Sequence, residues 1–275
     1  MIQLITDSSA DLPKEIIEKY NVKIVPLTIN IDGKEYREGV DIKPEEFYEK
    51  MSKAKNLPKT SQPSPAFFAE TFKSLSENGE MLCLTISSGL SGTYTSACMG
   101  KEMSETEVTV FDTLAGSLGH GLQLIEAGNL AKAGRSIKEI VEILDDYRKN
   151  INILILLNTL DNIVKGGRLN KFTGTISKVL DIKVLLEGIH GKVEIVEKIR
   201  GKKRFLKRTL DLIGERKKDF SETLFGITHI NNFSDAEYLK NEIISRYKPK
   251  DVIVNYMGAT MGTYAGDGGI IVSFR

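Results

Sequence analysis

The sequence predicts an α/β protein of two domains, with an N-terminal domain built on a parallel sheet and a C-terminal domain built on a mixed sheet. Two observations lead to this fold class. Short apolar runs alternate with amphipathic stretches along the chain, as in sheets that are covered by helices. The chain has 275 residues, of which 41% are hydrophobic, so it can bury the cores of two domains.

The first half of the chain alternates expected strands and helices, which is typical of a parallel sheet with helical connections. An amphipathic helix is expected between Ser136 and Lys149, where apolar residues recur on one face. Asp32-Gly33 suits a two-residue turn with positive φ, so a small hairpin insertion is expected near residues 27–40. The expected strands of the parallel sheet are Ile2–Thr6, Val22–Pro26, Met81–Ile86 and Glu107–Phe111.

Residues 56–65, NLPKTSQPSP, form a proline-rich segment that we call the strap. Because proline fixes φ and biases the preceding residue to extended geometry, the strap should be stiff and irregular. It can be a plain loop that ends in the N-cap Ser64 and the first-turn Pro65 of a helix. Alternatively, its hydroxyl groups face a ligand site.

The domain boundary is expected near Asn150, which gives an N-terminal domain of residues 1–150 and a C-terminal domain of residues 151–275. The turn expected at residues 188–191, GIHG, predicts a hairpin and therefore a mixed sheet in the second domain. The expected strands are Asn152–Leu157, Lys183–Leu186, Val193–Lys198, Leu224–Thr228, Val252–Asn255 and Ile270–Phe274.

Composition excludes several classes of protein. The 38 basic and 37 acidic residues nearly cancel, which argues against a protein that coats nucleic acid. The longest apolar run, Ile153–Leu157, is too short to cross a bilayer, and the N-terminus lacks the pattern of a signal peptide. We therefore expect a cytoplasmic protein. Three scattered histidines and two cysteines form no metal-binding motif, so no metal is expected.

The segment from Ser87 to Thr93, SSGLSGT, which we call the serine turn, follows an apolar run and precedes an expected helix. It does not match the nucleophile elbow of serine hydrolases, the phosphate loop or the dinucleotide-binding motif. A glycine-containing turn before a helix presents free backbone N–H groups, and Ser88, Ser91 and Thr93 add hydroxyl groups. The turn therefore suits a phosphate or a carboxylate, unless it only caps the helix.

Two further segments are rich in glycine. In VKGGRL, residues 164–169, a double glycine precedes Arg168, so the turn either aims a guanidinium group at an anion or simply ends a helix. GATMGTYAGDGG, residues 258–269, has a glycine density that usually marks the close approach of backbone to a ligand or another element. The basic run at residues 198–208 is expected to be a solvated helix face.

These motifs occur together, in this order, in a known family. The opening TDSSADLP, the strap, the serine turn, the KGGRL turn and the glycine-rich segment near the C-terminus resemble those of the DegV family of bacterial fatty-acid-binding proteins. The resemblance covers essentially the whole chain. It implies a long-chain fatty acid, such as palmitate, buried between the two domains, and no other cofactor. It also implies a carrier that is not an enzyme and presents its fatty acid to a separate ATP-dependent kinase.

The same resemblance implies the residues that hold the ligand. Thr60 and Ser91 are expected to hydrogen-bond the carboxylate, with the Gly92 amide as a third donor. Ser61 and Arg168 are further ligand-binding candidates. Arg168 and the basic residues Lys202, Lys203 and Arg204 are expected to matter more for a partner or its phosphate chemistry than for lipid binding. The last family motif usually contains a histidine, and here Tyr264 takes that position. A phenol can also donate a hydrogen bond, so Tyr264 is expected in the site.

Two other functions compete with the carrier. The chain can be an enzyme that acts on a small phosphorylated substrate at the same helix N-terminus. It can also be an interaction or regulatory protein whose cleft is vestigial.

Overall fold

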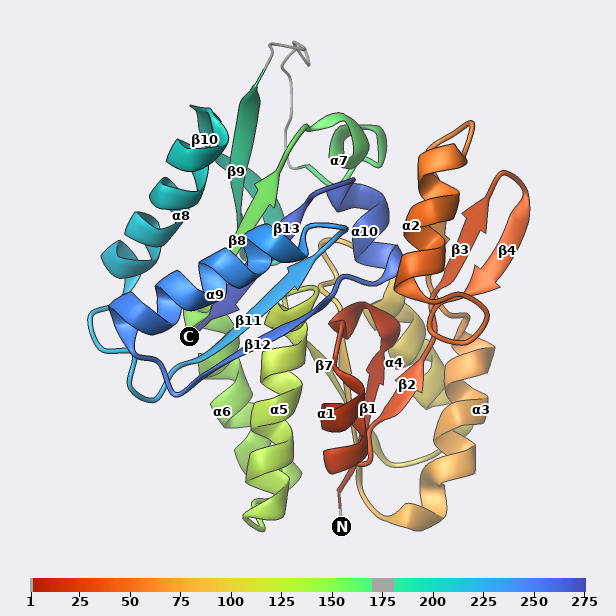
Figure 1. Cartoon of the computed structure of the whole chain (residues 1–275). Helices are drawn as coiled ribbons and strands as arrows, with labels where there is room; N and C mark the ends of the chain where they lie inside the picture. Colours follow the sequence, from red (N-terminus) through yellow and green to blue (C-terminus); the bar gives the residue numbers. More distant parts are fainter. Residues whose placement is uncertain (1, 170–180) are drawn as a thin grey trace.

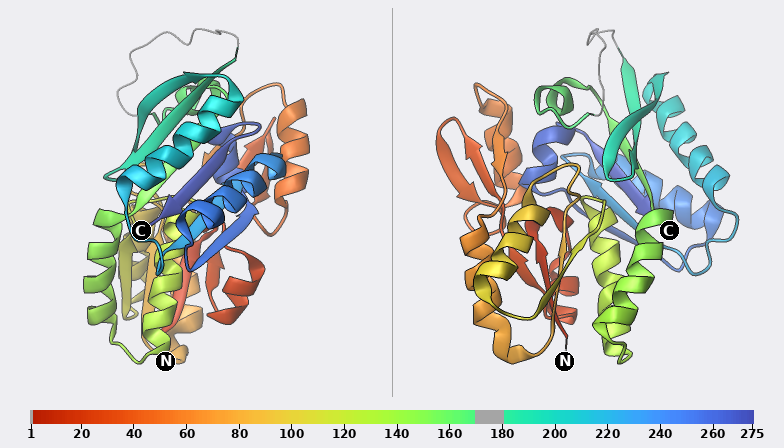
Figure 2. Two further views of the ribbon diagram at one scale, coloured as in Figure 1. Left: turned by 60° about the vertical axis from the view of Figure 1, so that its left-hand side comes forward. Right: turned by 180° about the vertical axis from the view of Figure 1, so that it is seen from behind.

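The computed structural model describes residues 2–169 and 181–275, and its described strands form three sheets. A four-stranded and a six-stranded sheet lie one beyond the other, with a small hairpin sheet at their side (Figure 1). The views from the side and from behind show helices on both faces of the four-stranded sheet (Figure 2). The predicted fold class, a parallel sheet followed by a mixed sheet, is confirmed.

The N-terminal sheet is parallel throughout and has the order β2-β1-β6-β7. Its central strands are buried on both faces, which is why they read as continuous apolar runs. Leu82 and Leu84 face one helical layer, and Cys83 faces the other. The strands are β1 (Gln3–Asp7), β2 (Lys23–Val25), β6 (Met81–Thr85) and β7 (Val108–Asp112), and the helices are α1 (Lys14–Lys19), α3 (Pro65–Leu75), α4 (Thr93–Ser104), α5 (Leu118–Lys132) and α6 (Ile137–Asn150), with short 3₁₀ turns at Ser8–Ala10 and Ser76–Asn78.

Two helix starts follow the expected capping rules. Ser64 accepts a hydrogen bond from the Phe67 amide, and proline occupies the first turn of α3. Ser136 and Glu139 form a capping box at the start of α6.

The C-terminal sheet has the order β10-β9-β8-β13-β11-β12, in which only β11 and β12 pair in parallel. The hairpin predicted at residues 188–191 joins β9 to β10, with positive φ at His190 and Gly191. The strands and helices of this C-terminal half are β8 (Asn152–Leu157), α7 (Asp161–Lys165), β9 (Ile182–Ile189), β10 (Lys192–Arg200), α8 (Lys202–Arg216), β11 (Leu224–His229), α9 (Phe233–Tyr247), β12 (Asp251–Tyr256), α10 (Ala259–Ala265) and β13 (Ile270–Phe274).

The third sheet contains the predicted hairpin and an additional strand. Asp32 and Gly33 have φ of 48° and 93° and connect β3 (Thr28–Ile31) to β4 (Lys34–Arg37). The strap was expected to be irregular, but its residues Lys59–Ser61 form strand β5, which pairs with β3. No proline falls within these three residues, so their backbone N–H groups remain free for pairing. Helix α2 (Pro44–Lys53) lies beside this sheet (Figure 1).

Helix α5 connects the two large sheets. Its Gly119 lies against Ile153 of β8, and its Leu118 lies against Gly226 of β11. Both glycines lack the room for a side chain, so the helix approaches the second sheet closely. The domain boundary near Asn150 stays a prediction, although α6 ends there and β8 begins at Asn152.

Within the described ranges, no helix is long and apolar enough to span a membrane, and no group of three or more potential metal ligands occurs.

Candidate ligand-binding site

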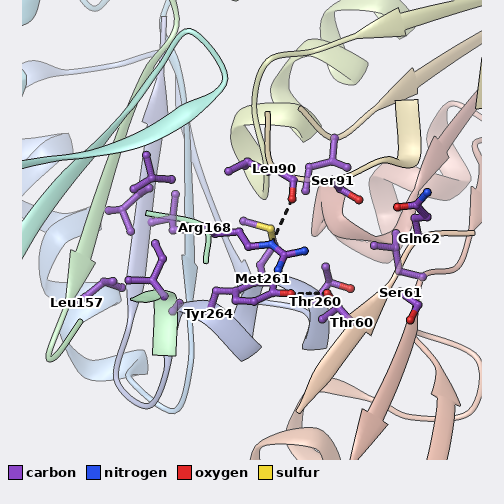
Figure 3. A pocket seen from close by; sticks show the side chains of 17 residues that line it. Thr60, Ser61, Gln62, Leu90, Ser91, Leu157, Arg168, Thr260, Met261 and Tyr264 are labelled. Carbon is purple, nitrogen blue, oxygen red and sulfur yellow. Dashed lines mark hydrogen bonds between the residues drawn. The ribbon is translucent and has the colours of Figure 1, made fainter. Parts of the chain in front are cut away.

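A cavity of about 350 Å³ lies where the three sheets meet. It receives side chains from the strap, the serine turn, α7, α10 and the C-terminal sheet (Figure 3). Its apolar lining consists of Leu27, Ile86, Leu90, Ile155, Leu157, Ile163, Val193, Met261, Ala265 and Ile271. Its polar lining consists of Thr60, Ser61, Gln62, Ser91, Arg168, Thr260 and Tyr264. The cavity is therefore mostly apolar, with a limited set of polar groups, which is typical of a site for a small molecule.

Thr60 and Tyr264, which are 204 residues apart in the sequence, meet in this cavity. Thr60 is half-buried on β5, and its Oγ1 lies 2.6 Å from the Tyr264 Oη on α10 (Figure 3). The Tyr264 ring packs on Gly166, where a Cβ atom would lie 2.4 Å from two ring carbons. The first glycine of the double glycine after α7, Gly166, therefore creates the space that the tyrosine ring occupies.

Arg168 also lines the cavity, and its guanidinium group stacks on the Tyr264 ring at 4.8 Å from the ring centroid. Its Nη1 donates to the Gly166 carbonyl at 2.5 Å, and its Nε donates to the Leu90 carbonyl at 3.4 Å. Among the described residues, no carboxylate forms an ion pair with Arg168. The turn ends α7 with Gly167 at φ 69°, as the helix-end interpretation expects. Arg168 lines the cavity, and its role in holding an anion stays a prediction.

The serine turn lies at the cavity through Ser91. Ser91 Oγ contacts Thr93 Oγ1 at 2.9 Å and accepts from the Thr93 amide at 3.3 Å, just before α4 begins. Ser88 is exposed, is not part of the lining, and has its amide bonded to Asp112. The turn thus both caps a helix and presents one hydroxyl group to the cavity.

Gly92 does not line the cavity but lies against Gln62, which does. It is the N-cap residue of α4, and a Cβ atom there would lie 2.4 Å from the Gln62 side chain. Gln62 covers this turn, donating to Ser96 Oγ at 3.1 Å, and it lines the cavity together with the exposed Ser61. Sequence reasoning missed Gln62, although its place in the strap next to Thr60 was a usable signal.

The glycine-rich segment folds as α10 and its flanking turns. Three of its polar side chains differ in their surroundings: Thr260 and Tyr264 line the cavity, and Thr263 is buried outside it. Gly258 and Gly262 allow close contact with other elements, as the glycine density indicated. Thr260 was also missed, because a single threonine among glycines gives no pattern that separates it from a core residue.

The remaining candidates lie elsewhere. Lys202, Lys203 and Arg204 are exposed at the start of α8 and do not line the cavity, so they are separated from Arg168. None of the three histidines lines it either. His120 is buried near β1 and β6, where burial lowers its pKa. The cavity therefore offers hydroxyl groups and a guanidinium group, without a histidine that could activate a serine.

Comparison with known proteins places the chain in a family. A family profile described as "Uncharacterised protein, DegV family" matches residues 1–275. The chain belongs to the DegV family. A DegV domain-containing protein of Caldanaerobacter subterraneus is 34% identical over 271 residues, covering 96% of this chain and 95% of the relative.

Solved DegV structures share the whole fold. One from Thermus thermophilus, described by its fatty-acid binding, has 30% identity and a TM-score of 0.93 over 100% of this chain and 99% of its own. Another, from Ruminococcus gnavus, is described with vaccenic acid and has 27% identity and a TM-score of 0.92 over 99% of both chains.

Proposed function

We propose that this protein binds a long-chain fatty acid in the cavity between its large sheets. The observation that carries the proposal is the composition of the wall: of its seventeen described lining residues, ten are apolar and the rest carry hydroxyl, amide or guanidinium groups. A small phosphorylated substrate would leave most of that apolar wall without a partner. The binding of fatty acids described for DegV relatives supports the same ligand class.

The carboxylate would lie at the polar groups contributed by Thr60, Ser91, Tyr264 and Arg168. Thr60 and Tyr264 share one hydrogen bond, so whichever hydroxyl group accepts it keeps its own proton for the ligand. Hydrogen bonds to a charged group contribute about 1.5–3 kcal/mol each. Ser61 and Gln62 of the strap also line the cavity, and Gly92 at the start of α4 lies against the Gln62 side chain.

The acyl chain would supply most of the affinity. Each buried methylene contributes about 0.8 kcal/mol, so about ten methylenes contribute roughly 8 kcal/mol before the costs of association. We infer that the protein acts as a carrier rather than an enzyme, since the described residues of the cavity wall include no nucleophile next to a base. On this proposal, a separate ATP-dependent kinase would phosphorylate the carboxylate that the carrier presents.

Extraction of the purified protein with organic solvent, followed by mass spectrometry, tests the ligand class. A long-chain fatty acid in stoichiometric amount supports the proposal. A phosphorylated metabolite, or a protein without ligand that also fails to bind added palmitate, would refute it.

A further inference from the structure

Two buried carboxylic acids lie behind the cavity at the start of α10. Asp11 and Glu38 are each 6% exposed. Both reach Gly258, where a Cβ atom would lie 2.5 Å from Glu38 Oε1 and 2.7 Å from Asp11 Oδ1. No lysine or arginine of the described ranges forms an ion pair with either acid. Glycine at position 258 is what allows the two acids to approach the helix together.

Glu38 is connected directly to the cavity wall. Its Oε1 accepts from the Thr260 amide at 2.8 Å, and its Oε2 accepts from Thr260 Oγ1 at 2.6 Å. Ser8 Oγ donates to the same Oε2 at 2.6 Å and accepts from the Leu27 amide at 3.0 Å. Thr260 and Leu27 both line the cavity. The Glu38 carboxylate is therefore bonded directly to Thr260 and, through Ser8, to Leu27. These two wall residues come from opposite ends of the sequence.

The hydrogen bonds favour an ionised Glu38 over an ionised Asp11. Three donor groups from two residues, the Thr260 amide, Thr260 Oγ1 and Ser8 Oγ, point at Glu38 and oppose the effect of burial, which raises its pKa. Asp11 accepts from the Gly258 amide and contacts Ser117 Oγ, which also contacts Thr228 Oγ1, so that bond can reverse if Asp11 holds a proton. Burial, followed by the charge of Glu38, raises the pKa of Asp11 well above its usual value.

We propose that Glu38 is a positioning residue for carboxylate recognition, acting through α10 on Tyr264. Thr260 and Tyr264 are four residues apart and lie on one face of the helix. Two hydrogen bonds to Thr260 fix both the place and the rotation of α10, and this rotation directs the Tyr264 hydroxyl to Thr60. The inference rests on the proposed function, since it assigns a residue that prepares the same site.

The test compares Glu38→Gln with the wild type, using palmitate and hexadecan-1-ol as ligands. An amide has only one acceptor oxygen, so it leaves at least one of the three donors without a partner. We expect palmitate to bind about tenfold more weakly, the effect of about one lost hydrogen bond. The affinity for the alcohol should change by less than about twofold, because the alcohol has the same chain but no charged group for the site to recognise. When Glu38→Gln is added to Tyr264→Phe, palmitate affinity should fall by less than a further factor of about two, because the hydroxyl group that Glu38 positions is already absent.

Glu35→Gln is the matched control, because Glu35 is exposed on β4, the strand that ends just before Glu38, and its substitution should leave both affinities unchanged. Equal losses for the acid and the alcohol, or unchanged binding of palmitate, would overturn the inference. If Glu38→Gln does not fold, Ser8→Ala, which removes one donor, should weaken palmitate selectively; failure to do so would also overturn it. Wild-type protein that does not bind palmitate would instead refute the proposed function.

Discussion

Thr60 and Ser91 are two of the hydroxyl residues that the described cavity wall receives from the N-terminal half, besides Ser61. They come from β5 and from the turn before α4, so they approach the polar end from different elements. We expect Thr60→Ala and Ser91→Ala each to weaken fatty-acid binding by about 1.5–3 kcal/mol, the value of a hydrogen bond to a charged acceptor. Titration with a fluorescent fatty acid measures this, and thermal unfolding checks that the fold is intact. Unchanged affinity in both variants would remove these residues from the carboxylate site.

Tyr264 makes three contacts in the site. Its hydroxyl meets Thr60, its ring packs on Gly166, and Arg168 stacks on the ring. We expect Tyr264→Phe to weaken binding by about 0.5–1.5 kcal/mol, since the hydroxyl alone is lost. Phenols titrate far above neutral pH and imidazole titrates near it, so Tyr264→His should bind more tightly as the pH falls from about 8 to 6, while the wild type changes little. Parallel pH profiles for the two proteins would contradict this assignment.

At the scale of elements, the strap and the α7 turn show what the sequence could and could not predict. Proline and glycine predicted where both segments turn, and the Ser64-Pro65 helix start is confirmed. The pairing of β5 with β3 was missed, because three residues are too few for a period to be detected. The contact between Gly166 and Tyr264 was also beyond sequence reasoning, since it depends on the packing of α10 against α7.

Gly166 and Gly167 form a matched pair for testing that contact. Gly166 has φ of −75°, which any residue adopts, but a Cβ atom there would collide with the Tyr264 ring. Gly167 has φ of 69°, and a Cβ atom there would meet nothing within 4 Å. We expect Gly166→Ala to lower fatty-acid affinity by displacing the ring. Gly167→Ala should instead lower the free energy of unfolding by about 1–2 kcal/mol, through backbone strain alone.

Affinity and urea unfolding, measured on both variants, separate these effects. A loss of affinity in Gly167→Ala equal to that in Gly166→Ala would show that the turn as a whole, rather than the tyrosine ring, determines binding.

At the scale of the whole molecule, the order of apolar runs predicted both large sheets, because strands buried on two faces are continuous apolar segments. The parallel and mixed sheets are confirmed. How the sheets lie against each other was not predictable, since it depends on small residues such as Gly119 and Gly226 that let α5 approach the second sheet. The cavity is a product of that packing. Its polar residues could be proposed from motifs, whereas most of its apolar wall could not be distinguished from ordinary core.

The buried acids at α10 join the two halves of the chain, and they should make the stability of the whole protein depend on pH. Burial raises the pKa of both Asp11 and Glu38, and the charge of Glu38 adds to the shift for Asp11. Between the usual pKa of a carboxyl group, about 4, and the raised values, the folded protein holds protons that the unfolded chain has released. The contribution of these acids to stability is therefore complete below that range and is lost as the pH rises through the raised values. Asp41 and Glu139, which lie at the surface, have their pKa lowered to about 2 by hydrogen bonds. Their contribution to stability is lost as the pH falls, but only below about pH 4.

We therefore expect the contribution of these acids to the free energy of unfolding to fall as the pH rises above about 5. Asp11→Asn should flatten this dependence, because an amide does not titrate and can still accept from the Gly258 amide and donate to Ser117 Oγ. Asparagine also tolerates the left-handed backbone at this position, where φ is 50°. Urea unfolding of both proteins from about pH 5 to 8 measures the effect, with Asp32→Asn at the exposed hairpin turn as a control for the loss of one charge. If the wild type and Asp11→Asn show the same slope, the proton is not held by Asp11, and the acids at α10 do not control the pH dependence of folding.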